Sequence, residues 1–185
     1  MTKASKISRR TKDTDNLYEN HIDIKNRRVF LFGEIDEDTA GLAIKSLLML
    51  DETEGPITIM INSPGGCVDS GWGLTDTLTG LKNEITGIVV GAAASMGSMV
   101  LQGCDIRKMT KNSSILIHNA SYNLQKPGSA LKTWAKFDKE EERKTIEIFA
   151  ARTKLSPSRL KQLFDAETIF NSEESLKYGL VDEIV

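Results

Sequence analysis

A serine and a histidine lie where two apolar segments of the sequence end. Ser95 lies within the small-residue stretch Gly91–Gly97, which follows the apolar run Ile85–Val90. His118 closes a second apolar run, and the chain has only one other histidine. A serine at a sharp turn between a strand and a helix exposes its hydroxyl, and a nearby histidine can accept the proton of that hydroxyl. The two residues therefore predict acyl transfer through a serine nucleophile.

A glycine-rich turn could supply the second half of an oxyanion hole. Pro64-Gly65-Gly66 follows the apolar run that ends at Ile61. Paired glycines permit positive φ and close approach of a ligand to the backbone. The N–H groups of Gly66 and Met96 would then stabilise the same developing negative charge. Taken alone, this segment could equally be a tight turn with no chemical role.

Each of these residues also has a structural interpretation. A serine among small residues is commonly a helix N-cap, and a single histidine at a strand end is commonly a hydrogen-bonded buried group. Trp72 and Trp134 lie in helical patterns and are interpreted as packing residues. Cys67 is interpreted as structural, because no neighbour in the sequence would lower the pKa of its thiol.

Strand and helix patterns alternate through the first half of the chain and would position these residues. Short apolar runs predict strands, and apolar residues at helical spacing predict helices. In order, these segments are strand 28–33, helix 37–51 with Asp36 or Asp38 as its N-cap, strand 57–61, helix 69–81, strand 85–90 and helix 95–102. This alternation is typical of right-handed βαβ crossovers on a parallel sheet. The predicted fold class is α/β.

The second half of the sequence predicts a long helix and a short closing unit. The helix over 130–154 is charged nearly all round at 136–144, and such a segment more often projects or bridges subunits than lies flat on a core. Ser156 and Pro157 indicate an N-cap and first residue of a short helix that ends at Phe164. A last helix from Ser172 to about Gly179 and a strand over 180–185 complete the chain.

The composition is that of a globular protein: 39% of the 185 residues are hydrophobic, 27% are charged and the net charge is −2. It predicts a single domain over 21–185 preceded by a flexible polar arm over 1–20. The charge gives no reason to expect nucleic-acid binding, and no apolar run is long enough to span a membrane. We expect a cytoplasmic protein in which Cys67 and Cys104 are free thiols. Neither a metal-ligand cluster nor a nucleotide-binding loop is indicated.

Four stretches of the sequence together resemble the proteolytic subunit of the Clp protease (ClpP) family. The resemblance extends from about Arg28 to the C-terminus, and the stretches occur in the family's order at nearly its spacings: Ile61–Gly66, Ala93–Gly97, Ile117–His118 and Ser172–Asp182. It implies a ClpP/crotonase-like βαβ superhelix in which the long helix is a projecting handle. The chain could be a divergent or viral member of the family.

The resemblance also implies roles for named residues. Ser95 would be the nucleophile, His118 the general base, and Gly66 and Met96 the donors of the oxyanion hole. The family's aspartate position falls on Glu167 in this sequence, and a glutamate supplies a carboxylate with a longer reach. Asp165 is the alternative carboxylate, two residues away.

The function that the resemblance implies is a serine endopeptidase of two stacked heptameric rings. The barrel would degrade unfolded polypeptides, fed by a separate AAA+ unfoldase, and would need no cofactor of its own. Three alternatives remain open at this stage. They are a ring subunit with a drifted triad that acts as a scaffold or regulator, a capsid-maturation protease, and a crotonase-type enzyme acting on an acyl-CoA.

Overall fold

The computed structural model describes residues 21–120 and 127–185. The predicted arm over 1–20 and part of the predicted loop over 119–129 lie outside the described residues. The described strands are β1 (Ile22–Asp23), β2 (Arg28–Phe32), β3 (Ile57–Ser63), β4 (Ile85–Ala94), β5 (Ile106–Met109), β6 (Ser114–Ile117), β7 (Thr168–Phe170) and β8 (Glu183–Ile184). The described helices are α2 (Glu37–Asp51), α3 (Val68–Gly80), α4 (Met96–Gln102), α5 (Gly128–Arg152), α6 (Pro157–Asp165) and α7 (Ser172–Tyr178).

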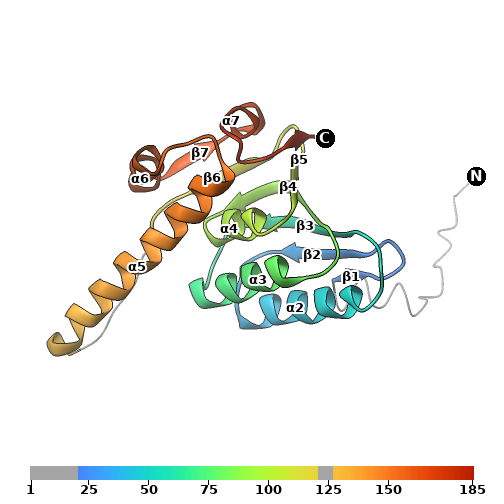
Figure 1. Cartoon of the computed structure of the whole chain (residues 1–185), viewed down its shortest axis with the longest axis horizontal. Coiled ribbons are helices and arrows are strands. Elements are labelled where there is room, and N and C mark those ends of the chain that lie inside the picture. The colour runs from blue at the N-terminus through green and yellow to red at the C-terminus, as the bar shows by residue number, and fades with distance from the viewer. Residues whose placement is uncertain (1–20, 121–126) are drawn as a thin grey trace, which may run out of the picture.

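The strands form one mixed, largely parallel sheet in the order β1-β2-β3-β4-β5-β8, with β6 beside β4 and β7 beside β6. The β1–β2 and β6–β7 pairs are antiparallel, and the other pairs are parallel. Helices α2, α3 and α4 lie on one side of this sheet (Figure 1). The expected α/β fold with a parallel sheet is confirmed.

Strand β4 branches the sheet and carries the serine. Its first half pairs with β5 through Thr86–Val89, and its second half pairs with β6 through Ala92–Ala94. The register with β3 shifts between these halves. Gly91, with φ of 103°, lies at this shift, and an added Cβ there would be 2.7 Å from Asn62 Oδ1. Irregularities of this kind bend a strand, so the C-terminal part of β4 is directed toward β6.

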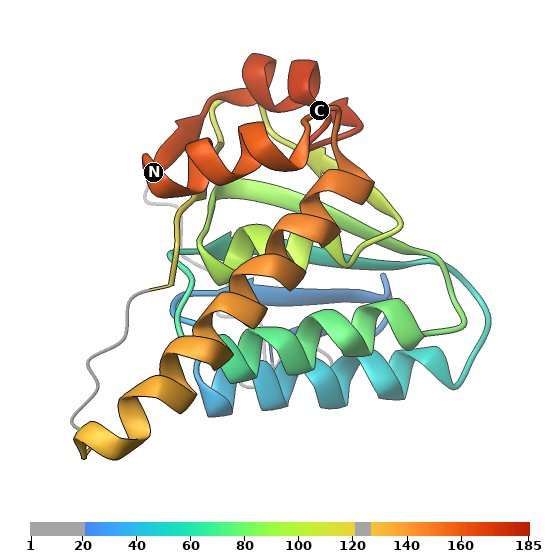
Figure 2. The same cartoon turned by 60° about the vertical axis from the view of Figure 1, so that its left-hand side comes forward.

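Helix α5 contacts α4 and α6 and projects from the body of the molecule (Figures 1 and 2). Its C-terminal part packs on the core through Phe149. The rings of Phe149 and Phe164 form a T-shaped pair with their centroids 5.2 Å apart. Its N-terminal part leaves Leu131 and Phe137 exposed. The projecting handle helix that the resemblance implied is therefore present.

Local signals in the sequence set most helix ends correctly. Asp36, not Asp38, caps α2, and it forms a capping box with Thr39. Ser156 caps α6, and Pro157 stands at its first turn. Gly179 ends α7 in the left-handed conformation, which glycine adopts at no steric cost.

Two predicted strand boundaries were wrong. The strand expected over 85–90 continues to Ala94, because the small residues there extend β4 beside β6 instead of turning at once. The strand expected over 180–185 is reduced to β8, two residues long. Leu180 instead turns back, and its N–H donates to the Ser175 carbonyl at 2.8 Å. The patterns also missed β1, β5 and β7.

A buried arginine attaches the C-terminal segment to the sheet. Arg107 is 6% exposed, and its guanidinium pairs with Asp182 at 2.6 Å. The same side chain donates to Gln102 Oε1 at 2.6 Å and to the Arg152 carbonyl at 2.9 Å. This network joins α4, α5 and β5 to the residues before β8. None of the described helices is long and apolar enough to cross a membrane.

Candidate active site

The Ser95 backbone adopts a strained conformation between β4 and α4. Its φ of 53° and ψ of −123° match the first central residue of a type II′ turn, a position that favours glycine. Its N–H donates to the Leu116 carbonyl at 2.9 Å, and its carbonyl accepts from the Ser98 hydroxyl at 2.7 Å. The turn is thus fixed on both sides, and the hydroxyl is left without a hydrogen bond to any described residue.

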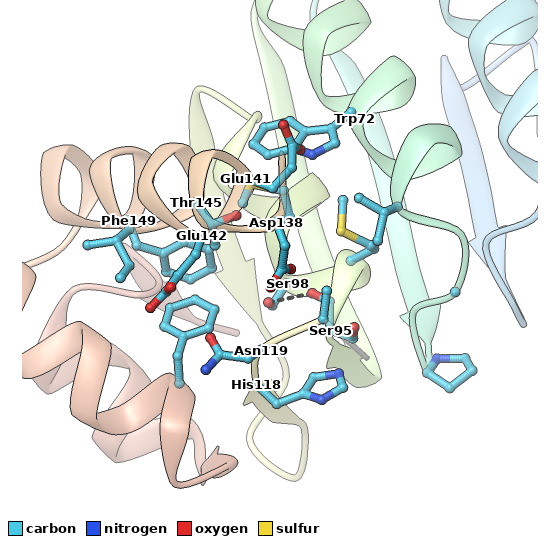
Figure 3. Close-up of a pocket in the computed structure, with 18 residues that line it drawn as sticks. Trp72, Ser95, Ser98, His118, Asn119, Asp138, Glu141, Glu142, Thr145 and Phe149 are labelled. Atoms are coloured by element: carbon cyan, nitrogen blue, oxygen red, sulfur yellow. Dashed lines mark hydrogen bonds between the residues drawn. The ribbon is translucent and has the colours of Figure 1, made fainter. Parts of the chain in front are cut away.

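His118 follows β6 at the same edge of the sheet. The second half of β4 and β6 run parallel, with Ala94 opposite Leu116. Parallel strands end at a common edge, so the serine turn and the histidine lie in the same region. Both line one cavity (Figure 3). Within the described ranges, no hydrogen bond joins the His118 ring to Ser95.

Gly65 packs directly against the serine turn. A Cβ at Gly65 would stand 2.6 Å from the Ser95 Cβ and 3.0 Å from the Met96 nitrogen. Gly65 also has φ of 92°. Only a residue without a side chain lets the two turns approach so closely.

The backbone N–H groups of Gly66 and Met96 have no hydrogen-bond acceptor among the residues that the structure describes. Gly66 forms a parallel bridge with Ile35. In this bridge the Ile35 N–H donates to the Gly65 carbonyl, and the Cys67 N–H donates to the Ile35 carbonyl. Successive N–H groups of an extended chain point to opposite sides, so the Gly66 N–H faces away from Ile35. Met96 is the first residue of α4 and has no acceptor within the helix. Both residues line the cavity with Ser95.

The two candidate carboxylates lie in different surroundings. The pairing of β6 with β7 ends with Ile117 opposite Thr168, and His118 and Glu167 are the residues that directly adjoin this last pair. Glu167 is exposed and has φ of 50°. Asp165 instead accepts a hydrogen bond of 2.7 Å from the Asn119 side chain and lies 3.8 Å from Lys161 Nζ. Across the described part of the chain, neither carboxylate is hydrogen-bonded to His118, and neither lines the cavity.

The cavity has a volume of about 350 Å³ and extends from the serine to α5 (Figure 3). One wall is a single face of α5, because its residues recur at helical spacing: Asp138, Glu141, Glu142, Thr145, Ile146 and Phe149. Trp72, interpreted from the sequence as a packing residue, also lines it. Sequence reasoning missed this wall because the charged stretch was interpreted as projecting or bridging subunits. The spacing of its uncharged members, Thr145, Ile146 and Phe149, was the available signal.

Lysines outside the cavity pair with two of the three carboxylates. Lys144 Nζ lies 2.9 Å from Glu141 Oε1, and Lys161 pairs with Glu142. Hydrogen bonds to these glutamates raise the pKa of Lys144 and of Lys161 above the ordinary value. Among residues 21–120 and 127–185, no group of three or more histidine, cysteine, aspartate or glutamate side chains is arranged so that it could hold a metal ion.

The cysteines are free, as expected, but the reason for interpreting Cys67 as structural, that no neighbour would lower the pKa of its thiol, was wrong. Cys104 is buried, and desolvation raises the pKa of its thiol to about 12. Cys67 is exposed, and hydrogen bonds from the side chain and backbone of Ser70 lower the pKa of its thiol. The helical turn that begins at Cys67 places Ser70 beside it, which residue types alone did not indicate.

Comparison with known protein families accounts for nearly the whole chain. The family model described as Clp protease matches residues 10–185. The match includes the serine turn, the glycine turn, the strand that ends at His118 and the closing unit. Membership of this family indicates a protease of the serine type. By this match and by its fold, the chain belongs to the Clp protease family.

Proposed function

We propose that the protein is a serine endopeptidase in which Ser95 is the nucleophile and His118 the general base. The observation that carries the proposal is the Ser95 backbone, held at φ of 53° and ψ of −123° at the mouth of a cavity that His118 also lines. A strained strand-to-helix turn is the conformation that exposes a nucleophilic hydroxyl and places a free N–H beside it.

In the proposed reaction, His118 accepts the Ser95 proton as Oγ attacks the scissile carbonyl carbon. The carbonyl oxygen takes the resulting negative charge between the N–H groups of Gly66 and Met96. The protonated imidazole then donates to the leaving amine, the C–N bond breaks, and an acyl-enzyme remains. Water, deprotonated by His118, attacks the ester and releases the second product as Ser95 regains its proton.

Glu167 is the proposed third member of the triad. Its place in the chain supports it, because Glu167 and His118 directly adjoin the last pair of the β6–β7 ladder, Ile117 and Thr168. A carboxylate there would accept the second ring N–H of His118 and hold the imidazole in the required tautomer. Asp165 is the alternative, although Asn119 already donates to its carboxylate.

The proposal includes assembly into two stacked heptameric rings that a separate AAA+ unfoldase supplies with unfolded polypeptide. The family match and the exposed apolar residues of α5 support it. Enclosure would restrict cleavage to chains threaded into the barrel.

The direct test is labelling with a fluorophosphonate, followed by mass spectrometry and by turnover of a fluorogenic peptide. The adduct is expected on Ser95, and Ser95→Ala should abolish both labelling and turnover. Ser158→Ala, which removes an exposed hydroxyl on α6, is the matched control and should behave as wild type. An adduct elsewhere, or turnover that survives Ser95→Ala, would contradict the proposal.

One observation favours the scaffold or regulator as a second candidate. In the described residues of the single chain, no hydrogen bond joins Ser95, His118 and a carboxylate. A ring subunit with no activity would show neither labelling nor turnover, alone or with its partner unfoldase. A crotonase would use the paired amides for a thioester enolate and would need no labelled serine. A capsid-maturation protease would pass the labelling test and differ in its substrate.

A further inference from the structure

We infer that the cavity beside Ser95 selects polypeptide substrates with a lysine or arginine side chain at the residue whose carbonyl is attacked. This inference rests on the proposed function and assigns the substrate class of the same site. Its basis is the distribution of charged and apolar groups along one face of α5.

The α5 wall of the cavity changes in character along its length (Figure 3). Thr145, Ile146 and Phe149 form its C-terminal part, and Phe149 is 1% exposed. Asp138, Glu141 and Glu142 form its N-terminal part. At 1.5 Å per residue, the wall from residue 138 to residue 149 is roughly 16 Å long. The cavity therefore has an apolar portion and an acidic portion.

Residues of other elements complete the lining of the cavity. They include Met99 of α4, Phe164 of α6 and Trp72 of α3, and Trp72 lies at the same end of the α5 wall as Glu141 (Figure 3). These groups suit a methylene chain, which gains free energy when it leaves water. No lysine or arginine is among the lining residues that the structure describes.

The acidic portion retains charge that the protein does not neutralise. Asp138 makes no hydrogen bond or ion pair with any residue in the described ranges. Glu141 is 8% exposed, and only one of its two carboxylate oxygens is paired, with Lys144. The lysines that pair with Glu141 and Glu142 have side chains that are 48% and 54% exposed. A cationic group in the cavity would therefore meet carboxylates with free acceptor positions.

Lysine and arginine match the chemistry of both portions, because each has an apolar stem and a charged head. An uncharged side chain of the same length would fill the apolar portion but remove water from the carboxylates without replacing its hydrogen bonds. That loss is unfavourable. An acidic side chain would in addition be repelled.

The test compares peptides that differ only at this residue, cleaved by the assembled wild-type protein. Lysine, arginine, norleucine, leucine and glutamate are placed in otherwise identical internally quenched peptides. Norleucine matches the lysine stem without its charge. We expect kcat/KM for lysine and arginine to exceed that for norleucine by about tenfold, with glutamate lowest. The ratio should fall as salt is raised. A wild-type preference for norleucine or leucine would overturn the inference.

Charge-neutralising variants locate the preference. Asp138→Asn and Asp138→Asn/Glu142→Gln should lower the lysine-to-norleucine ratio, the double variant by about tenfold. Glu140→Gln is the matched control, since Glu140 lies on the same helix, pairs with Arg143 and does not line the cavity. An unchanged ratio in the double variant, or an equal loss in the control, would show that the cavity carboxylates do not select the substrate.

A binding measurement separates this inference from the proposed function. Ser95→Ala protein is titrated calorimetrically with two product peptides, N-acetyl-Ala-Ala-Lys and N-acetyl-Ala-Ala-norleucine. If no peptide is cleaved but the lysine product binds more tightly, the selective cavity stands and the peptidase assignment is wrong. If peptides are cleaved without a lysine preference, the peptidase assignment stands and the inference is wrong. Equal binding of both products with no cleavage contradicts both.

Discussion

At the scale of single residues, two turns of unusual backbone meet at the candidate site. Ser95 and Gly65 both have positive φ, and the missing side chain of Gly65 leaves the space in which the serine turn sits. The position of the nucleophile is thus set by a contact between two backbones. Backbone contacts of this kind leave little freedom to relax after substitution.

Gly65→Ala should therefore lower both stability and activity. Its Cβ would stand 2.6 Å from the Ser95 Cβ, and alanine at positive φ costs about 1–2 kcal/mol before any clash. Displacement of the serine by 1 Å could reduce turnover by roughly a hundredfold. Urea unfolding and peptide turnover measure the two effects.

Gly41→Ala is the control for that substitution. Gly41 lies inside α2, and an added Cβ would meet nothing within 4 Å. Alanine is the better helix former, so this variant should gain about 0.5–1 kcal/mol and keep its activity. If Gly65→Ala is as stable and active as Gly41→Ala, the close approach of the two turns has no mechanical role.

Single substitutions can also decide whether Glu167 or Asp165 is the third member of the proposed triad. Glu167→Gln should reduce kcat by about 10³–10⁴-fold, because an amide cannot hold the imidazole in the required tautomer. Asp165→Asn keeps a side chain near Asn119 and should reduce kcat by less than about tenfold. Steady-state kinetics on the assembled protein separate the two. The reverse order of effects would assign the third position to Asp165.

At the scale of elements, the sequence predicted the helices whose apolar periodicity and capping residues mark their ends. The boundaries of α2, α5 and α6 came within about two residues of the structure, since apolar spacing and N-caps mark them. Strands β1, β5 and β7 were missed because two to four residues are too few to show alternation. Without β7, the pairing that brings Thr168 opposite Ile117, next to Glu167 and His118, could not be worked out from the sequence.

Part of the lining of the candidate site could be expected from the sequence, because local patterns mark the ends of strands. Ser95, His118, Gly66 and Met96 follow strand ends, which a sequence pattern can locate, and all four line one cavity. The acidic wall of α5 was missed because a charged stretch is also the pattern of a solvated helix. Its role depends on a contact of α5 with α4 that no local signal encodes.

The network around Arg107 makes a prediction about pH. Burial alone would raise the pKa of the Asp182 carboxyl, but hydrogen bonds from Arg107 and the charges of Arg107 and Arg152 hold that pKa below its ordinary value. A lowered pKa in the folded state adds stability above the unfolded pKa of about 3.9. This stability is lost as the pH falls from about 5 through the folded pKa.

Asp182→Asn should therefore unfold more easily at pH 7, by about 2 kcal/mol, since it leaves the buried Arg107 without its counter-charge. The wild type and the variant should converge in stability as the pH falls from 5 toward 3. Urea unfolding at several pH values gives both curves. A gap that stays constant with pH would show that the loss comes from packing and not from the charge.

At the scale of the whole molecule, α5 divides its tasks along its length. The C-terminal part packs on the core and forms the cavity wall, whereas the N-terminal part projects with Leu131 and Phe137 exposed (Figure 2). Exposed apolar side chains on a projecting helix are unfavourable in a monomer, and their burial at an interface would be favourable. The helix thus links substrate selection to the proposed contact between rings.

Phe137→Glu should weaken the contact between stacked rings by placing a charge in an apolar interface. Light scattering is expected to show a particle of about half the wild-type mass, while Phe137→Leu should keep the full mass. A wild-type protein that scatters as a 20.4 kDa monomer would contradict the proposed assembly, and a Phe137→Glu particle of unchanged mass would exclude this residue from the contact.

The positive φ of Ser95 has a consequence for how this protein can be improved or can drift. Glycine would occupy that backbone position without strain, so selection for thermal stability alone should favour replacing Ser95 by glycine. Such a variant should melt at a higher temperature than the wild type and hydrolyse nothing. In a natural relative that has lost catalysis, we expect this replacement to be among the first changes. Any other residue at this position would keep the free-energy cost of the positive φ without the catalytic activity.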